Sequence, residues 1–410
     1  MVRRPPPADP AVRALAGLAQ AGLTRRRLLA LGGGAVGLAA LSACAPPLPP
    51  AANKADIVLP TDLSATEKIV NWDNWTAYLD VDDAGKTHPT LDAFMKQTGI
   101  KVTYTEAIDD NDTYFNKIAP QLRQGQTINR DLFVFTDWMA NRIIQQDLCQ
   151  PLDLIQMPHA PNLIPSLREV SFDPGRHYSL PWQGGFGGIG YNKKKVGREL
   201  KSISDLWAPD LKGKVSVLSE FRDTVGLIMQ SQGVDVSGPF TAAQIQAGFD
   251  EVSKRVADGS IRKIKGNAYI EDLKSGNSIA AICWSGDIAT LRTESGDDSW
   301  TFVIPDSGGT LWTDNMLIPI TSTHRSNAEK LMDYYYEPEV AAQVAAWVNY
   351  VCPVLGAQEI LAKTDAELAK NPFIFPTEGY LKQHKVETFR ALTSQEDADY
   401  SAIWAKVQGN

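Results

Sequence analysis

Aromatic residues recur beside small polar and acidic residues at the ends of predicted strands. In open α/β sheets, ligands bind beyond the carboxyl ends of the strands. Aromatic faces attract an organic ammonium group by cation–π interaction, and carboxylates accept its N–H hydrogen bonds. A single tryptophan in such a place is more often part of a core, but the recurrence favours a cation-binding site. The segments are Asn74–Tyr78, Thr136–Trp138, Pro181–Gly185, Trp284–Asp287 and Leu311–Asp314.

Motifs of covalent or cofactor chemistry are weak in this sequence. The spacing of glycines in Gly185–Gly190 matches the dinucleotide-binding fingerprint. That fingerprint requires a helix that begins at its glycines, whereas this segment is expected to be extended. We interpret it as a glycine-rich crossover between lobes. The five histidines stand in unrelated contexts, and no Gly-x-Ser-x-Gly elbow occurs. Tyr334–Tyr336 could suggest ligands for ferric iron, but they lie in a predicted amphipathic helix, which favours core packing. We expect no catalytic residue, no metal and no cofactor.

The N-terminal segment carries the features of an export signal. Thr24–Leu29 resembles a twin-arginine signal, and the apolar run Leu28–Ala40 is too short and too rich in glycine to span a bilayer. Leu41–Cys44 resembles a bacterial lipobox, whose cysteine is lipidated. The alternative is a basic membrane anchor that is never cleaved. We predict a signal peptide at 1–43 and a lipid anchor at Cys44, on the extracellular face of the cell membrane or in the periplasm.

The remaining chain has the properties of an acidic two-lobe body. Residues 44–65 comprise Cys44 and a proline-rich tether, which is too extended to join a core. The segment before Cys44 holds six arginines and one acid, so its removal takes the net charge from −8 to −13. An acidic body argues against nucleic acid and is compatible with a cationic ligand. The body also exceeds the roughly 250–300 residues at which single cores stop growing, so two lobes are expected.

Three further cysteines are too widely spaced for any zinc pattern. They are Cys149, Cys283 and Cys352. Outside the cytoplasm one pair could be oxidised, leaving one free thiol. The sequence leaves the choice of pair open.

The hydrophobic pattern alternates between strands and helices. Such alternation predicts an α/β organisation with largely parallel sheets. Strands are expected at Lys68–Trp72, Ile100–Thr105, Asp131–Thr136, Lys214–Ser219 and Ser278–Trp284. Helices are expected at 90–98, 112–124, 138–148, 223–232, 242–257 and 268–275.

Several motifs between about Ile69 and Ile360 resemble those of one known family. They are Asn74-Trp75-Thr76-x-Tyr78, Gln97–Val102, Asp131–Val134, Ser179–Trp182, Ser204–Gly213, Trp284–Asp287, Trp312–Asp314 and Tyr336–Gln343. With these motifs the chain resembles the spermidine/putrescine-type extracellular solute-binding proteins of bacterial ABC importers. The resemblance implies an α/β, two-lobe periplasmic-binding-protein-like fold of type II, with lobes joined by crossover strands. We expect 66–185 plus 287–322 to form lobe 1 and 186–286 plus 323–410 to form lobe 2.

The resemblance also implies ligand-binding residues, position by position. Trp75, Thr76 and Tyr78 would line the wall of the first lobe, joined by Thr136 and Trp138, and the acids match family members at four further positions. The implied residues are Trp75, Thr76, Tyr78, Thr136, Trp138, Glu220, Asp223, Trp284, Asp287 and Asp314.

Ala77 departs from the pattern of the resembled family, whose members commonly carry an acid at this place. A buried ammonium without a partner costs several kcal/mol. Either Asp73 or Asp137 replaces the missing acid, or the ligand carries fewer charges. A quaternary amine such as a betaine, another amine-bearing solute and a modified sugar acid stay open as ligands.

Two classes of function follow from these observations. The resemblance implies a lipid-anchored, non-enzymatic binding component that delivers a small cationic solute, spermidine or putrescine, to an ABC permease. It also implies a monomer. The alternative is a secreted enzyme or sensor on the same scaffold, because a fold alone does not fix a function. The lack of a nucleophile–base motif favours the binding component.

Overall fold

The computed structural model describes residues 58–82 and 84–409. The predicted signal peptide, Cys44 and most of the tether lie outside the described residues. Within the described residues, no helix has both the length and the apolar character needed to cross a membrane.

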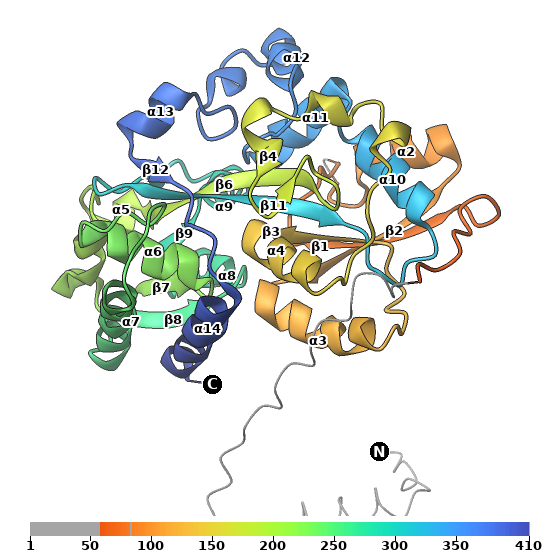
Figure 1. Ribbon diagram of the computed structural model, residues 1–410. Helices are drawn as coiled ribbons and strands as arrows, with labels where there is room; N and C mark the ends of the chain where they lie inside the picture. The colour runs from red at the N-terminus through yellow and green to blue at the C-terminus, as the bar shows by residue number, and fades with distance from the viewer. Residues whose placement is uncertain (1–57, 83, 410) are drawn as a thin grey trace, which may run out of the picture. The chain divides into compact units, whose positions relative to one another are not determined.

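A single mixed sheet runs through the described body (Figure 1). Its strands lie in the order β2-β1-β3-β11-β6-β9-β7-β8, with β10 paired to β6 and β12 to β11. Pairing is parallel among β2, β1 and β3 and among β9, β7 and β8, but antiparallel around β11 and β6. The expected parallel pattern therefore holds in two groups of strands, which are joined by antiparallel strands. The bounds are β1 Ile69–Trp75, β2 Lys101–Ile108, β3 Leu132–Thr136, β6 Leu180–Asn192, β7 Val215–Leu218, β8 Ile261–Lys265, β9 Ala280–Trp284, β10 Trp300–Val303, β11 Gly309–Leu317 and β12 Val386–Glu387; β4 Glu169–Val170 and β5 Asp173–Pro174 form a separate pair.

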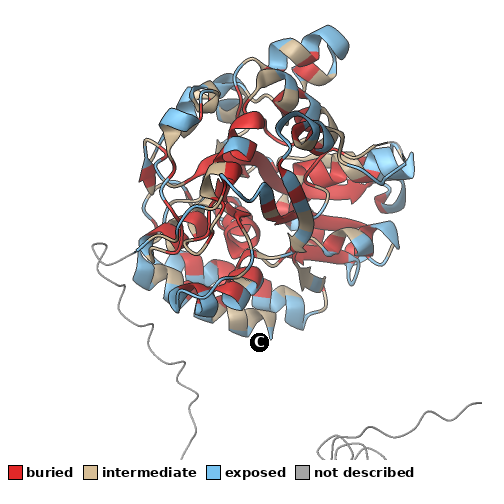
Figure 2. Cartoon of the chain, turned by 90° about the vertical axis from the view of Figure 1, so that its right-hand side faces the viewer, coloured by how far each residue is buried: buried red, intermediate tan, exposed pale blue. Residues whose placement is uncertain are grey.

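Helices pack around both groups of strands, with buried faces toward the sheet and exposed faces outward (Figure 2). Local sequence sets several of their ends. Thr241 and Gln244 form a capping box at the start of α7, and Gly99 ends α2 in the left-handed conformation, with φ 70°. The bounds are α2 Pro89–Thr98, α3 Asn111–Arg123, α4 Asp137–Gln145, α5 Lys193–Val196, α6 Phe221–Ser231, α7 Ala242–Ala257, α8 Tyr269–Lys274, α9 Ser285–Ser295, α10 Arg325–Tyr334, α11 Pro338–Val348, α12 Ala357–Thr364, α13 Glu378–Gln383 and α14 Ser394–Gln408.

Buried apolar side chains form two cores. The first core gathers side chains from β1–β3, α2–α4 and α10–α12, and the second from β7, β9, α6, α7, α9 and α14. The long strand β6 connects them, since its Trp182 belongs to the first core and its Ile189 to the second. The chain returns to the first core at Met316 in β11.

The cores differ in two places from the lobe boundaries expected from sequence. Residues 325–374, expected in lobe 2, contribute to the first core, because α10 packs near β1 and α11 near α2. The second crossing was expected near Ser285–Asp287, but these residues form the first turn of α9. Ile288 and Leu291 of that helix are buried in the second core.

The glycine-rich segment Gly185–Gly190 is part of the buried strand β6. A Cβ atom at Gly187 would lie 2.1 Å from Thr310 Oγ1, and one at Gly190 would lie 2.5 Å from Cys283 Sγ. Glycine is therefore required because neighbouring strands approach closely. The extended interpretation is confirmed, and the segment is no nucleotide-binding turn.

The tyrosines and cysteines singled out by sequence are core residues. Tyr335 packs edge-on against Trp182, with ring centroids 4.9 Å apart, which agrees with the expected core role. Cys283 and Cys352 are buried thiols without a disulfide, and Cys149 is buried as well.

His324 ties two acidic side chains together just before α10. Its ring nitrogens lie 2.9 Å from Asp131 Oδ1 and 3.0 Å from Glu67 Oε2. Burial opposes protonation, but the hydrogen bonds to both carboxylates outweigh it and raise the pKa of His324 above its ordinary value.

We expect His324→Gln to destabilise the protein more at pH 6 than at pH 9. A raised folded-state pKa stabilises the fold fully below the unfolded value, about 6.5, and that contribution is lost as pH rises through the folded value. The loss at pH 6 should be about 1–2 kcal/mol of unfolding free energy, measured by urea denaturation. His177→Gln, at an exposed position, is the control, and an equal loss at both pH values would contradict the ion-pair explanation.

Candidate functional site

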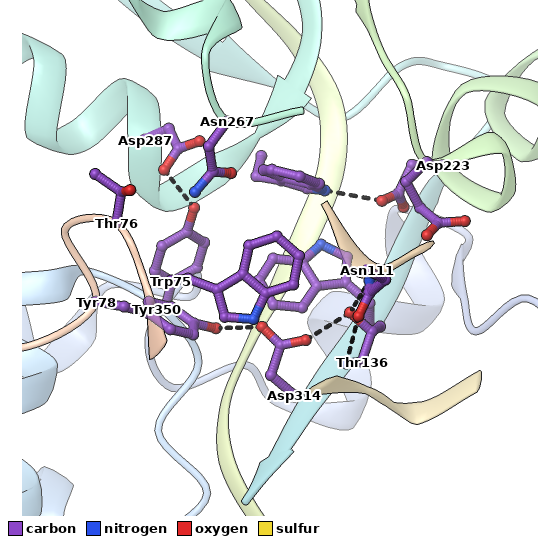
Figure 3. A pocket seen from close by; sticks show the side chains of 13 residues that line it. Trp75, Thr76, Tyr78, Asn111, Thr136, Asp223, Asn267, Asp287, Asp314 and Tyr350 are labelled. Carbon is purple, nitrogen blue, oxygen red and sulfur yellow. Dashed lines mark hydrogen bonds between the residues drawn. The ribbon is translucent and has the colours of Figure 1, made fainter. Parts of the chain in front are cut away.

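A pocket lies where the two parallel groups of strands point their carboxyl ends at each other (Figure 3). It holds about 410 Å³ of space unfilled by atoms, including its opening to solvent. All six of these strands supply lining residues from their ends or from the segments that follow, because carboxyl ends of parallel strands share one edge. The lining residues are Trp75, Thr76, Tyr78, Asn111, Thr136, Glu220, Asp223, Asn267, Trp284, Asp287, Trp312, Asp314 and Tyr350.

Aromatic rings form a continuous wall of this pocket. Trp284 lies with its ring centroid 6.3 Å from that of Trp75 and 6.0 Å from that of Trp312. Tyr350 extends the wall, 5.4 Å from Trp312 and 5.3 Å from Tyr78. Trp75 comes from the first group of strands and Trp284 from the second. The wall therefore joins both halves of the body.

Three pocket aspartates each accept two hydrogen bonds from protein groups. Asp287 accepts from the hydroxyls of Tyr269 and Tyr350, both at 2.7 Å. Asp314 accepts from Tyr78 Oη at 3.0 Å and Thr136 Oγ1 at 2.7 Å (Figure 3).

Asp223 also accepts two hydrogen bonds. It accepts from Trp284 Nε1 at 2.8 Å and from Thr310 Oγ1 at 2.6 Å. These donors fix each carboxylate in place before any ligand arrives.

Burial favours the protonated form of the pocket acids and so raises their pKa values. Desolvation raises the pKa of Glu220 to about 8, against the opposing effect of Arg222. It also raises the pKa of Asp314 to about 7 and that of Asp287 to about 6, and it raises the pKa of Asp223. No lysine or arginine is among the described lining residues. A ligand cation entering this pocket would favour the ionised carboxylates.

The structure brings together nine of the ten ligand-binding residues expected from sequence. Trp138 is the exception, since its ring centroid lies 3.8 Å from the guanidinium carbon of Arg222 and 4.9 Å from that of Arg142. The ring is thus engaged by two cations of the protein itself and does not line the pocket.

Four lining residues were missed as candidates, namely Asn111, Asn267, Trp312 and Tyr350. Trp312 belongs to one of the strand-end aromatic segments, so the sequence carried its signal. Asn111 donates from Nδ2 to Thr136 Oγ1 at 2.9 Å and so supports the Asp314 cluster. Asn267 follows β8 and Tyr350 follows α11, where no local pattern marks them.

Neither acid expected to replace the one missing at Ala77 lines the pocket. Asp73 pairs with Arg130 Nε at 2.5 Å, and Asp137 accepts from Asn315 Nδ2 at 2.7 Å. Ala77 itself has a left-handed backbone, with φ 56°, and its N–H donates to Glu106 Oε1 at 2.8 Å. The expectation that Asp73 or Asp137 fills this role is therefore not met.

The profile of the bacterial extracellular solute-binding proteins matches residues 90–376, more than half of the chain. The chain belongs to this family. The predicted resemblance to polyamine-type solute-binding proteins is confirmed by the similar proteins described next.

Two relatives from Escherichia coli (strain K12) illustrate this similarity. A spermidine/putrescine-binding periplasmic protein is 28% identical over 309 residues, which cover 74% of this chain and 82% of the relative. A putrescine-binding periplasmic protein is 27% identical over 363 residues, covering 84% and 93%. The similarity thus spans most of both proteins.

Solved structures show the same periplasmic-binding-protein-like fold. A putative spermidine/putrescine ABC transporter protein from Listeria monocytogenes superposes with a TM-score of 0.70 at 27% identity, covering 83% of this chain and 99% of that one. A spermidine/putrescine transporter substrate-binding protein from Streptococcus pneumoniae gives a TM-score of 0.65 at 26% identity, covering 83% and 98%.

We expect Asp314→Asn to stabilise this solute-binding protein at pH 8 in the absence of solute. An acid whose folded pKa lies above its unfolded value costs stability as pH rises between the two values. The gain at pH 8 should be about 1–2 kcal/mol of unfolding free energy, falling toward zero near pH 4, where the acid is largely protonated.

Urea denaturation at pH 4, 6 and 8 measures this gain. Asp399→Asn, an exposed aspartate outside the pocket, is the control for loss of charge. A destabilised Asp314→Asn protein at pH 8 would show that the carboxylate is a net structural contact.

Proposed function

We propose that this chain is the substrate-binding component of an ABC importer and captures a polyamine such as spermidine or putrescine. The observation that carries the proposal is a group of four acids within an aromatic wall, namely Glu220 and the buried Asp223, Asp287 and Asp314. Rings pack against methylene groups and attract ammonium groups, and carboxylates accept their N–H bonds. The names of the E. coli relatives support the same ligand class.

We further propose that the two cores are lobes that close around the solute. The pocket takes walls from both, so a solute that touches both walls favours the closed arrangement. The loop before α3 meets the loop before α8 beside the pocket. There, the N–H groups of Asn267 and Ala268 donate to Asp109 O at 3.2 Å and Asp109 Oδ1 at 3.0 Å.

We propose export and anchoring from the N-terminal sequence. A lipid on Cys44 and the proline-rich tether after it would hold a monomeric body at the membrane surface, where it delivers solute to a permease. The tether is shorter than the predicted 44–65, since Ser64 is buried in the body and its Oγ accepts from Asn327 N–H at 3.1 Å. This role involves no covalent chemistry.

A single-cation ligand is the second candidate, because Ala77 supplies no carboxylate and neither expected replacement reaches the pocket. Such a ligand would be a betaine or another quaternary amine.

We expect Asp287→Asn to weaken polyamine binding by about 2–5 kcal/mol, because it leaves a desolvated ammonium without its charged partner. Isothermal titration of spermidine and putrescine into wild type and variant measures the loss. Asp399→Asn is the control. Unchanged affinity for a polyamine that wild type binds would remove Asp287 from the site.

Ala77→Asp separates the two ligand candidates. The left-handed backbone at this position tolerates aspartate. For a single-cation ligand, the added acid should weaken native binding and improve putrescine binding by about 1.5–3 kcal/mol. Titration of both proteins with a diamine and a quaternary amine gives the answer. Tight spermidine binding by wild type that the substitution leaves unchanged would exclude the single-cation ligand.

We expect Gly266→Ala to hold the lobes apart without harming either one. A Cβ atom there would lie 2.3 Å from Asp109 O, across the lobe contact. Solute affinity should fall at least tenfold, about 1.4 kcal/mol, while the melting temperature without solute changes little. Gly379→Ala, whose Cβ would have its nearest neighbour at 3.9 Å, is the control. Wild-type affinity in Gly266→Ala would contradict closure through this contact.

A further inference from the structure

Asp397 of the C-terminal helix α14 pairs with two arginines at once. Its Oδ2 accepts from Arg142 Nη2 at 2.6 Å and Nε at 2.9 Å, and its Oδ1 accepts from Arg222 Nη2 at 2.5 Å. The side chain of Arg222 is 8% exposed and that of Arg142 is 17% exposed, so solvent screens these pairs only weakly.

The two arginines belong to different halves of the body. Arg142 lies on α4, next to the first core, and also donates to Asp112 Oδ1 of α3 at 2.6 Å. Arg222 lies on α6, which is part of the second core. Asp397 therefore connects the halves through one carboxylate.

Helix α14 is fixed on the second half and reaches across to the first (Figure 1). Tyr400 and Trp404 are buried in the second core, and Trp404 Nε1 donates to Ser219 O at 2.5 Å. At its other end, Ser394 Oγ donates to Gln145 Oε1 of α4 at 3.2 Å. Helix α14 thus contacts both halves of the body.

Trp138 completes this contact. Its ring stacks with Arg222 from the second half and Arg142 from its own helix. Two guanidinium groups on one ring repel each other, and the carboxylate of Asp397 between them offsets that repulsion. Separation of the halves would break both the Asp397–Arg142 pair and the Trp138–Arg222 stack.

The same chain of contacts ends at the pocket. Arg222 Nη1 donates to Glu220 Oε1 at 3.2 Å, and Glu220 lines the pocket whereas Arg222 does not. Asp397 holds the other end of this guanidinium. Without Asp397, only its ring contacts would hold Arg222 away from the pocket acids, where its guanidinium would compete with a ligand cation.

We propose that Asp397 is a positioning residue that clasps the two lobes and holds Arg222 back from the solute site. The clasp comprises Asp397, Arg142, Arg222 and Trp138. It rests on the proposed function in one respect, namely that closure of the lobes accompanies solute binding.

Asp397→Asn, Arg142→Gln and the double variant test the clasp, with Asp399→Asn on the same helix as the control. Small-angle scattering of the whole chain without solute should show a larger radius of gyration for both single variants, as for Gly266→Ala. Spermidine titration should show an affinity about tenfold lower for each, the effect of losing a charge-assisted hydrogen bond. The double variant should be no weaker than Asp397→Asn, because both changes break one contact. Asp399→Asn should match wild type.

If both single variants have the radius of gyration of wild type without solute, the proposal is wrong, whatever their affinities are. The proposal is also wrong if the losses of spermidine affinity in the two single variants add up in the double variant. If Asp397→Asn does not fold, Arg142→Gln carries the same test, since its side chain is partly exposed. Failure of wild type to bind any polyamine would count against the proposed function, whereas the scattering comparison would still decide the clasp.

Discussion

Burial of three aspartates within an aromatic pocket is the constraint on which the rest of this structure depends. Each aspartate loses water on folding, and no lysine or arginine is among the described residues that line the pocket. Hydroxyl and indole donors hold Asp223, Asp287 and Asp314 in fixed orientations, but the pKa of each stays raised. The site is therefore preorganised for positive charge at the expense of stability, as is common where function sets the requirement.

The sheet arrangement follows from this need for two facing walls. Two parallel groups of strands end at the pocket, and the antiparallel strands β6 and β11 keep both groups in one sheet. Close strand contacts at Gly187 and Gly190 leave no room for side chains there. Backbone hydrogen bonds between paired strands connect the cores, while loops and α14 make further contacts between the halves.

Perturbed acids beside tyrosine hydroxyls also occur in enzyme active sites, so the chemistry of the pocket alone permits either class. Membership of the solute-binding family favours binding. The geometry agrees with that choice, because each of the three aspartates accepts at least one hydrogen bond from another residue that lines the pocket. Ala77 itself is not among the residues that line the pocket.

Sequence by itself determined the alternation of strands and helices and most of the pocket wall. Trp75, Thr136 and Trp284 end strands, and the rule that parallel strands bind ligands at their carboxyl ends depends only on local pattern. The lobe boundaries, Tyr350, Asn267 and the position of Trp138 depended on which distant segments pack together. Trp138 has the same local signal as Trp284, but Arg222, far along the chain, occupies its face. Only tertiary structure decides such contacts, because local sequence does not specify the partner that desolvates or neutralises a side chain.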